Sequence, residues 1–162
     1  KKVIENSISE INSLNCINFT PSYLKNIIDD GPLNYFLEIN SKENFFTDIN
    51  EGVNEGYTVT YAALQLAYFM GFSKIILIGL DHRYKFYGKP NQESFVKGKD
   101  INHFCENYFA EQPWDNPDLN NFEKYFQIAK EVFMRDNRKI IDCTIDGNCN
   151  IFKKSLLEDV LK

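Results

Sequence analysis

The sequence lacks the features that mark membrane-spanning and secreted proteins. No apolar run reaches the roughly 18 residues that a transmembrane helix needs, and the stretch from Lys1 to Asn6 has no apolar secretory signal. We therefore expect a cytoplasmic protein without a transmembrane segment. With 162 residues, 43% of them hydrophobic and 15% aromatic, the chain is long enough to bury one sizeable core. We expect a single domain over residues 1–162.

The sequence contains no CxxC pair and no excess of positive charge. The 4 cysteines are scattered and form no CxxC pair, so we expect reduced, structural thiols and no metal cluster. The formal net charge is −5. A protein that binds nucleic acid mainly through its phosphates is usually basic, so we expect no nucleic-acid partner.

Several sequence motifs of enzymes are also missing. The chain contains no GxGxxG fingerprint and no Walker loop, which would indicate a bound dinucleotide or nucleoside triphosphate. It has no nucleophile elbow and no Ser/His/Asp order, which would indicate a hydrolase. Any functional site must therefore be argued from the position of polar residues along the predicted elements.

The most informative stretch runs from Gly56 to His82. Apolar residues fill nearly every position between Thr58 and Met70, which predicts a buried helix with Thr58 as its N-cap. Residues 75–78 form a short, mostly β-branched apolar run, as is typical of a parallel strand buried on both faces. This combination predicts an α/β domain with a Rossmann-like, mostly parallel sheet and helices on both faces.

The remaining pattern supplies further predicted elements. Asn116-Pro117-Asp118 predicts a helix start with Asn116 as the cap, followed by apolar residues at helical spacing up to Phe133. Residues 83–115 read as a long loop, which is typical of lids and binding loops. We also expect helices over 4–14, from Thr20-Pro21 onward and from the capping box at Ser155, and strands over 33–39 and 139–143.

Gly56, Thr58 and Thr60 surround the start of the predicted central helix. Free backbone N–H groups and the positive end of the helix dipole favour an anion there, such as a phosphate or carboxylate. The alternative is that Gly56 only forms a turn and Thr58 only caps the helix. The spacing alone does not separate these two interpretations.

Asp81 and His82 follow the predicted buried strand. Ligands of open α/β sheets bind beyond the carboxyl ends of the strands, so these two side chains are expected to emerge at the ligand edge. An aspartate there can hold a sugar or ribose hydroxyl or a metal, and a histidine can act as an acid, a base or a phosphate donor. Alternatively, Asp81 caps the following loop and His82 is an incidental surface residue.

His103 lies among aromatic residues inside the predicted long loop. Histidine is the usual side chain for removing a proton from an attacking hydroxyl. The alternative is a small satellite core in which His103 satisfies a backbone group.

Several of these segments together resemble a known family. They are Glu55-Gly56-Tyr57-Thr58-Val59-Thr60-Tyr61, Ile78-Gly79-Leu80-Asp81-His82, Asn102-His103-Phe104, Tyr108-Phe109, Trp114 and Asn116-Pro117. The chain resembles, over about residues 45–152, the MptE-like family of domains related to 6-hydroxymethylpterin diphosphokinase. That family includes flagellar motility accessory factors and is related in fold to bacterial lipooligosaccharide sialyltransferases.

The resemblance implies a Rossmann-like transferase that uses a nucleotide-activated donor. The leading hypothesis is glycosyl transfer from a CMP-linked nonulosonic or sialic acid to a cell-surface glycan or protein hydroxyl. Gly56, Thr58 and Thr60 would then bind the donor, Asp81 would orient its sugar or ribose, and His103 would be the base. The resemblance leaves open diphosphate transfer from ATP to a pterin alcohol, which would require Mg²⁺. The sequence does not determine the oligomeric state and leaves open a homo-oligomer.

One element of the family is missing from the chain. Family members commonly begin with a strand and a Gly-Asn-Gly-Pro-Ser loop that holds the nucleotide, and nothing before Ile17 resembles it. Two expectations follow. Either the chain is an N-terminally truncated piece with only one wall of the donor site, or it is a non-catalytic accessory domain that only binds.

Overall fold

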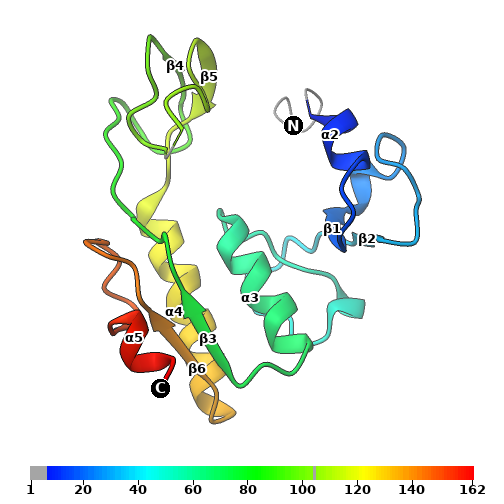
Figure 1. Ribbon diagram of the computed structural model, residues 1–162, viewed down its shortest axis with the longest axis vertical. Helices are drawn as coiled ribbons and strands as arrows, with labels where there is room; N and C mark the ends of the chain where they lie inside the picture. Colours follow the sequence, from blue (N-terminus) through cyan, green and yellow to red (C-terminus); the bar gives the residue numbers. More distant parts are fainter. Residues whose placement is uncertain (1–6, 104) are drawn as a thin grey trace.

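The computed structural model describes residues 7–103 and 105–162, which form a mixed α/β fold with small parallel sheets and helices (Figure 1). Ile4 of the first predicted helix and Phe104 of the family resemblance lie outside the described residues. The elements are, in order, α2 Ile8–Asn12, β1 Asn18–Pro21, η1 Ser22–Leu24, β2 Asn34–Leu37, η2 Ile49–Glu51, α3 Val59–Phe69, β3 Lys74–Leu77, β4 Glu93–Val96, β5 Gln112–Asp115, α4 Leu119–Arg135, β6 Lys139–Asp142, β7 Lys153–Lys154 and α5 Leu157–Val160.

The described strands are divided among three sheets. β3, β6 and β7 form a parallel sheet in the order β3-β6-β7, and β1 pairs in parallel with β2. β4 and β5 form an antiparallel pair. The prediction of a mixed α/β chain with parallel pairing is confirmed, but these strands do not form the one continuous sheet that we expected.

The core is built between α3 and α4. Phe126, Ala129 and Phe133 of α4 recur at intervals of three and four and are fully buried, as expected for the apolar face of an amphipathic helix. The ring of Phe45 meets those of Tyr61, Tyr68 and Phe133 edge-on, at centroid distances of 5.7, 5.5 and 6.0 Å. Edge-to-face pairs of this kind add to the free energy gained by burying the rings.

The parallel sheet packs against this core. Ile140 of β6 belongs to the core, and Ile75 and Leu77 of β3 pack on it. Next to the sheet, the Lys74 ammonium donates a hydrogen bond to the backbone oxygen of Val160 in α5. β3 and β6 run in the same direction, so their carboxyl ends lie at the same edge of the sheet (Figure 1).

The helix starts predicted at Thr20 and at Asn116 are wrong. Thr20 and Pro21 do not begin a helix: they are the last residues of β1, whose pairing with β2 holds them extended, and only the short η1 follows. At α4, the N-cap is Asp118, whose side chain accepts from the Asn121 N–H, and not Asn116. Asn116 is buried, and its amide donates to the backbone oxygens of Tyr87 and Lys89.

The segment predicted as a loop over residues 83–115 contains the β4–β5 hairpin. The hairpin projects from the end of the molecule where β3 ends and α4 begins (Figure 1).

Near the C-terminus, α5 starts at Leu157 without a side-chain cap hydrogen bond, so the capping box predicted at Ser155 does not form. None of the helices in the described residues has the length and apolar character needed to cross a bilayer.

We predict that Gly56→Ala strongly destabilises the fold. Gly56 has a φ of +54°, and a Cβ at this position would lie 2.3 Å from the Tyr61 ring, which is fully buried. Left-handed strain and overpacking together should lower the free energy of unfolding by about 3 kcal/mol.

Gly71→Ala is the matched control for urea denaturation. Gly71 also has a positive φ, of +85°, but nothing lies within 4 Å of the added Cβ. Its substitution should cost about 1 kcal/mol, from the backbone strain alone. Equal losses in the two variants would contradict the role assigned to the contact between Gly56 and Tyr61.

Candidate functional site

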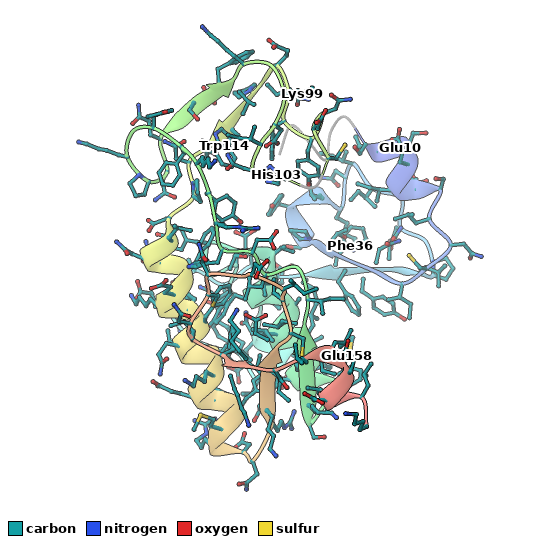
Figure 2. The ribbon with its side chains drawn as sticks, turned by 60° about the vertical axis from the view of Figure 1, so that its left-hand side comes forward. Glu10, Phe36, Lys99, His103, Trp114 and Glu158 are labelled. Carbon is teal, nitrogen blue, oxygen red and sulfur yellow. The ribbon has the colours of Figure 1, made fainter. Side chains whose placement is uncertain are left out.

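The structure distributes the candidate residues over three places. Gly56, Thr58 and Thr60 lie at the start of α3, Asp81 lies beyond the end of β3, and His103 lies in the segment between β4 and β5. None of the three cavities described below is lined by members of two of these groups. Figure 2 shows His103 beside Trp114 near the hairpin, well away from Glu158 of α5.

At the start of α3, Thr58 is the N-cap that the sequence predicted. Its hydroxyl accepts a hydrogen bond from the Thr60 N–H at 3.3 Å, which satisfies one of the free donors of the first turn. The Gly56 N–H donates to the Asn54 side-chain oxygen at 2.7 Å, which fixes the turn before the helix. The structural roles that were the alternative for Gly56 and Thr58 are therefore present.

Two hollows meet at this helix start. One is a largely apolar groove of about 450 Å³ that includes Thr58, and the other is a hollow of about 350 Å³ that includes Gly56. Both are lined by Ile39, Glu55 and Tyr57. There is therefore room for a ligand beside the N-terminus of α3, where the helix dipole favours a negatively charged group.

Asp81 lines a cleft of about 990 Å³ beyond the carboxyl ends of β3 and β6. Its side chain is exposed, as expected for this position, and its backbone oxygen accepts from the Asn148 N–H at 2.8 Å. Thr144 and Ser155 also line the cleft. The cleft thus offers carboxylate and hydroxyl groups, which suit a ligand rich in hydroxyl groups.

An ion pair between a buried carboxylate and a partly exposed lysine forms one wall of this cleft. The Asp142 carboxylate is fully buried and accepts hydrogen bonds from the Lys154 ammonium and, at 2.9 Å, from the Thr144 N–H. The same ammonium donates to the backbone oxygen of Gly147 at 3.2 Å. Because a buried carboxylate needs such partners, this pair holds the end of β6 to β7.

His82 does not emerge into the cleft, so the expected position of its side chain is wrong. Its backbone has a φ of +49°, and its ring is buried near those of Phe122 and Phe126. Its Nε2 lies 3.0 Å from Glu123 Oε1. His82 therefore links the segment after β3 to the first turns of α4, which is a structural role.

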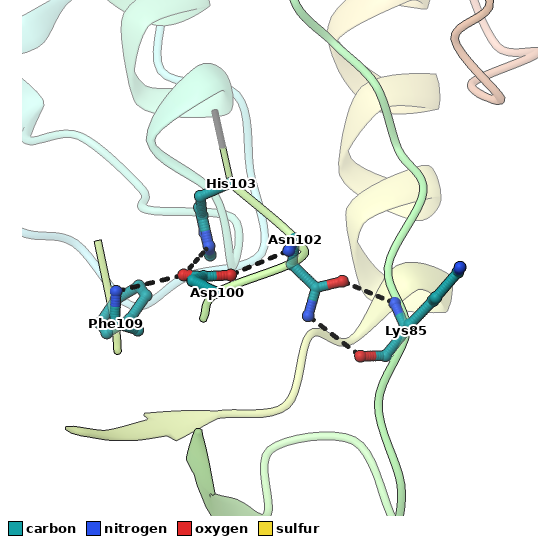
Figure 3. A network of polar contacts seen from close by, with 5 residues as sticks. All are labelled: Lys85, Asp100, Asn102, His103 and Phe109. Carbon is teal, nitrogen blue, oxygen red and sulfur yellow. Dashed lines mark hydrogen bonds and ion pairs between the residues drawn. The ribbon is translucent and has the colours of Figure 1, made fainter. Parts of the chain in front are cut away.

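His103 is held by a buried carboxylate (Figure 3). Its Nδ1 lies 2.7 Å from Asp100 Oδ2, and the same oxygen accepts from the Phe109 N–H at 3.1 Å. The other carboxylate oxygen accepts from the Asn102 N–H at 2.8 Å. Asn102 in turn exchanges two hydrogen bonds with the backbone of Lys85, at 2.7 and 3.0 Å.

Aromatic rings enclose the His103 imidazole. Tyr108 stacks on it at a centroid distance of 4.8 Å and an angle of 17°, and Trp114 meets it edge-on at 5.7 Å. Phe109 lies at 5.1 Å. The side chain still has 24% of its surface exposed. The ring is therefore fixed in orientation but open to solvent, and no residue in the described part of the chain makes a hydrogen bond to Nε2.

The electrostatics of Asp100 follow from these contacts. Burial by itself would raise the pKa of its carboxyl, but hydrogen bonds from the Asn102 backbone, the His103 ring and the Phe109 backbone outweigh burial and lower the pKa. An ionised carboxylate only accepts hydrogen bonds, so the hydrogen in this contact belongs to Nδ1 of His103. The neutral ring then has its lone pair on Nε2, where it can accept a proton.

Sequence reasoning missed Asp100, Asp142 and Lys154. Asp100 stands three residues before His103, a spacing that the sequence shows but that does not distinguish a buried partner from a solvated carboxylate. Asp142 lies near the end of the predicted strand 139–143 and is the last residue of β6, where the rule applied to Asp81 also holds. Lys154 could not be found in this way, because its pairing with Asp142 depends on the placement of β7.

The described residues contain no ready-made metal site. Across residues 7–103 and 105–162, no group of three or more His, Cys, Asp and Glu side chains is close enough to hold a metal ion. The 4 cysteines are free thiols, of which Cys143 and Cys149 are buried. Burial raises the pKa of Cys149, which disfavours its reactive thiolate form.

In comparisons with known proteins, no family model, curated protein or solved structure matched this chain. The MptE-like resemblance stays a prediction from the sequence. The site assignments depend on the geometry of the described residues.

Replacing Asp100 by Asn should reduce stability in a pH-dependent way. A carboxyl whose pKa is lowered by folding stabilises the native state above its unfolded pKa of about 3.9, and this contribution is lost as the pH falls through the folded value. Asp100→Asn should therefore unfold more easily at pH 7, by about 2 kcal/mol. The difference from wild type should shrink below about pH 4.

Urea denaturation at a series of pH values measures this difference. Asp30→Asn is the control, because Asp30 is exposed and should change stability little at any pH. A constant difference between Asp100→Asn and wild type from pH 7 to pH 3 would contradict the role of the Asp100 charge.

Proposed function

We propose that this chain is a transferase domain that moves a glycosyl group from a nucleotide-activated donor to a hydroxyl acceptor. The donor class is a CMP-linked nonulosonic acid, and the acceptor is a hydroxyl of a cell-surface glycan or protein. The observation that carries the proposal is the contact of 2.7 Å between Asp100 and His103, which leaves Nε2 as the proton-accepting atom. The family resemblance supplies the donor and acceptor classes.

The reaction is a displacement assisted by a general base. Nε2 of His103 removes the proton of the acceptor hydroxyl while its oxygen attacks the anomeric carbon of the donor. The bond between that carbon and the phosphate oxygen breaks, and CMP leaves with the electron pair. Asp100 holds the ring in position and stabilises the imidazolium that forms, as the aspartate does in hydrolase triads.

The donor is assigned to the start of α3. The phosphate would lie beside Gly56 and Thr58, where the helix dipole stabilises negative charge, and the hollows there accommodate the rest of the nucleotide. Asp81 would orient a sugar or ribose hydroxyl from the cleft at the end of β3. The proposal requires the hairpin that carries His103 to approach these residues when substrates bind.

A Rossmann-like arrangement of the domain is part of the proposal. It is supported by the order of β3, α4 and β6, in which two parallel strands are joined by a helix that packs on the core beside them. The hairpin is inserted between β3 and α4, at the carboxyl edge of the sheet. Ligand sites of such folds lie at this edge.

We predict that His103→Gln abolishes turnover and spares donor binding. Loss of a general base should lower the rate of CMP release from CMP-sialic acid by about 10²-fold or more. CMP should still raise the melting temperature of the variant, because a ligand that binds only the folded state stabilises it. Chromatographic measurement of released CMP and thermal-shift measurement test the two parts separately.

His82→Gln is the matched control, because His82 is the only other histidine in the chain. This variant should lose stability through its contact with Glu123 but should retain turnover below its melting temperature. Unchanged turnover in His103→Gln would reject the assignment of the base. A protein that binds neither CMP nor CMP-sialic acid, or that acts only with ATP, Mg²⁺ and a pterin alcohol, would contradict the proposed function.

A further inference from the structure

The outer edge of β3 has unpaired backbone groups. The backbone oxygens of Ser73 and Leu77 accept hydrogen bonds from Lys139 and Cys143 and therefore point toward β6. Backbone groups of a strand alternate in direction, so the N–H and C=O groups of Lys74, Ile76 and Ile78 point away from β6. Among the described residues, none of these outward groups has a hydrogen-bond partner, and no strand pairs with this edge.

The two edges of the sheet differ in their protection. The opposite edge is β7, which is only two residues long and consists of Lys153 and Lys154. Short edge strands and lysines are devices that prevent pairing with another chain. β3 has no proline or bulge along its apolar run, and its one charge is Lys74 at the start. Beyond the strand, Ile78 has 69% of its surface exposed.

The composition of β3 is also unusual for an edge. Apolar runs without alternation are typical of parallel strands that have neighbours on both sides and are buried on both faces. Here Ile75, Ile76 and Leu77 are only partly buried, in contrast to the fully buried side chains of the core. The strand has the sequence of a central strand at the position of an edge strand.

We propose that β3 pairs with β3 of a second copy of this chain. Around a twofold axis the two strands run antiparallel, and Ile76 of one copy lies opposite Ile76 of the other. Lys74 of each copy then lies opposite Ile78 of the other copy, so no like charges face each other. The two three-stranded sheets become one six-stranded sheet, and Ile76 can exchange two backbone hydrogen bonds with its counterpart.

The second copy is favoured over an unrelated peptide by this self-complementarity and by closure of the assembly. A twofold contact uses the same surface on both copies and cannot extend further. The lysines of β7 block the remaining edges of the six-stranded sheet. The assembly therefore ends at a dimer. This dimer proposal does not depend on the proposed transferase function.

The test is the mass of the chain in solution. Wild type should sediment or elute at twice 18.9 kDa in the micromolar range. Ile76→Pro removes an outward N–H that no neighbouring strand of the monomer uses, and proline is tolerated at such edge positions. It should weaken dimerisation by at least about tenfold, the factor that corresponds to the roughly 1.4 kcal/mol of one or two hydrogen bonds. Ile76→Val, which keeps the N–H, should dimerise like wild type.

Amide hydrogen exchange on the wild-type chain provides a second measurement that needs no variant. The N–H groups of Ile76 and Ile78 should exchange more slowly as the protein concentration rises, because the dimer protects them. A wild-type monomer throughout the micromolar range would overturn the proposal. It would also be overturned by a dimer that Ile76→Pro leaves intact, or by exchange at Ile76 that does not depend on concentration.

Discussion

The packing of α3 against α4 is the contact on which the rest of the structure depends. Tyr61, Phe126 and Phe133 have no exposed surface, and Phe45 closes the aromatic cluster between the two helices. Each helix leads into a parallel strand, α3 into β3 and α4 into β6. Fixing the helices side by side therefore brings the carboxyl ends of both strands to one edge and creates the cleft that Asp81 and Asp142 line.

The same packing sets the turn before α3. Because the Tyr61 ring fills the space beside residue 56, only glycine fits there. The buried Gln65 amide, one turn further along α3, accepts from the backbone of Phe46 and Asn54 and so ties the preceding loop to the helix. The hollows near Thr58 thus depend on core residues, and a substitution in the core would alter them without touching a ligand.

The His103 site is organised independently of this core. Its centre is the Asp100 carboxylate, which gathers two backbone N–H groups and the imidazole within one short segment. Asn102 attaches that segment to Lys85, and Asn116 attaches the chain after β5 to the backbone of Tyr87 and Lys89. Polar side chains therefore hold the hairpin region together where the apolar core does not reach.

The sequence predicts best where local pattern and tertiary role agree. The ranges of α3, β3, α4 and β6 follow closely from the apolar pattern. In α4, the residues that set the periodicity, such as Phe126 and Phe133, are also those that the core buries. Thr20 and Pro21 are residue types favoured at a helix start. They are nevertheless extended, because β1 pairs with β2, which lies further along the sequence. A local pattern carries no information about that pairing.

The candidate site was predictable in its positions and not in its contacts. Placing Asp81 beyond β3 needed only the strand and the rule for carboxyl ends. The burial of His82 depends on a left-handed backbone and on Glu123, which lies 41 positions further along the chain. Asp100 could be recognised as the partner of His103 only once the fold had buried it.

The tautomer of His103, measured by the ¹⁵N chemical shifts of its ring nitrogens and the proton couplings to them, is the most direct test of the proposed base. At a pH where the ring is neutral, we expect the hydrogen on Nδ1 and none on Nε2, because Asp100 accepts from Nδ1 at 2.7 Å. Asp100→Asn should remove this preference. A wild-type ring with its hydrogen on Nε2 would contradict the assignment of Nε2 as the atom that accepts the acceptor's proton.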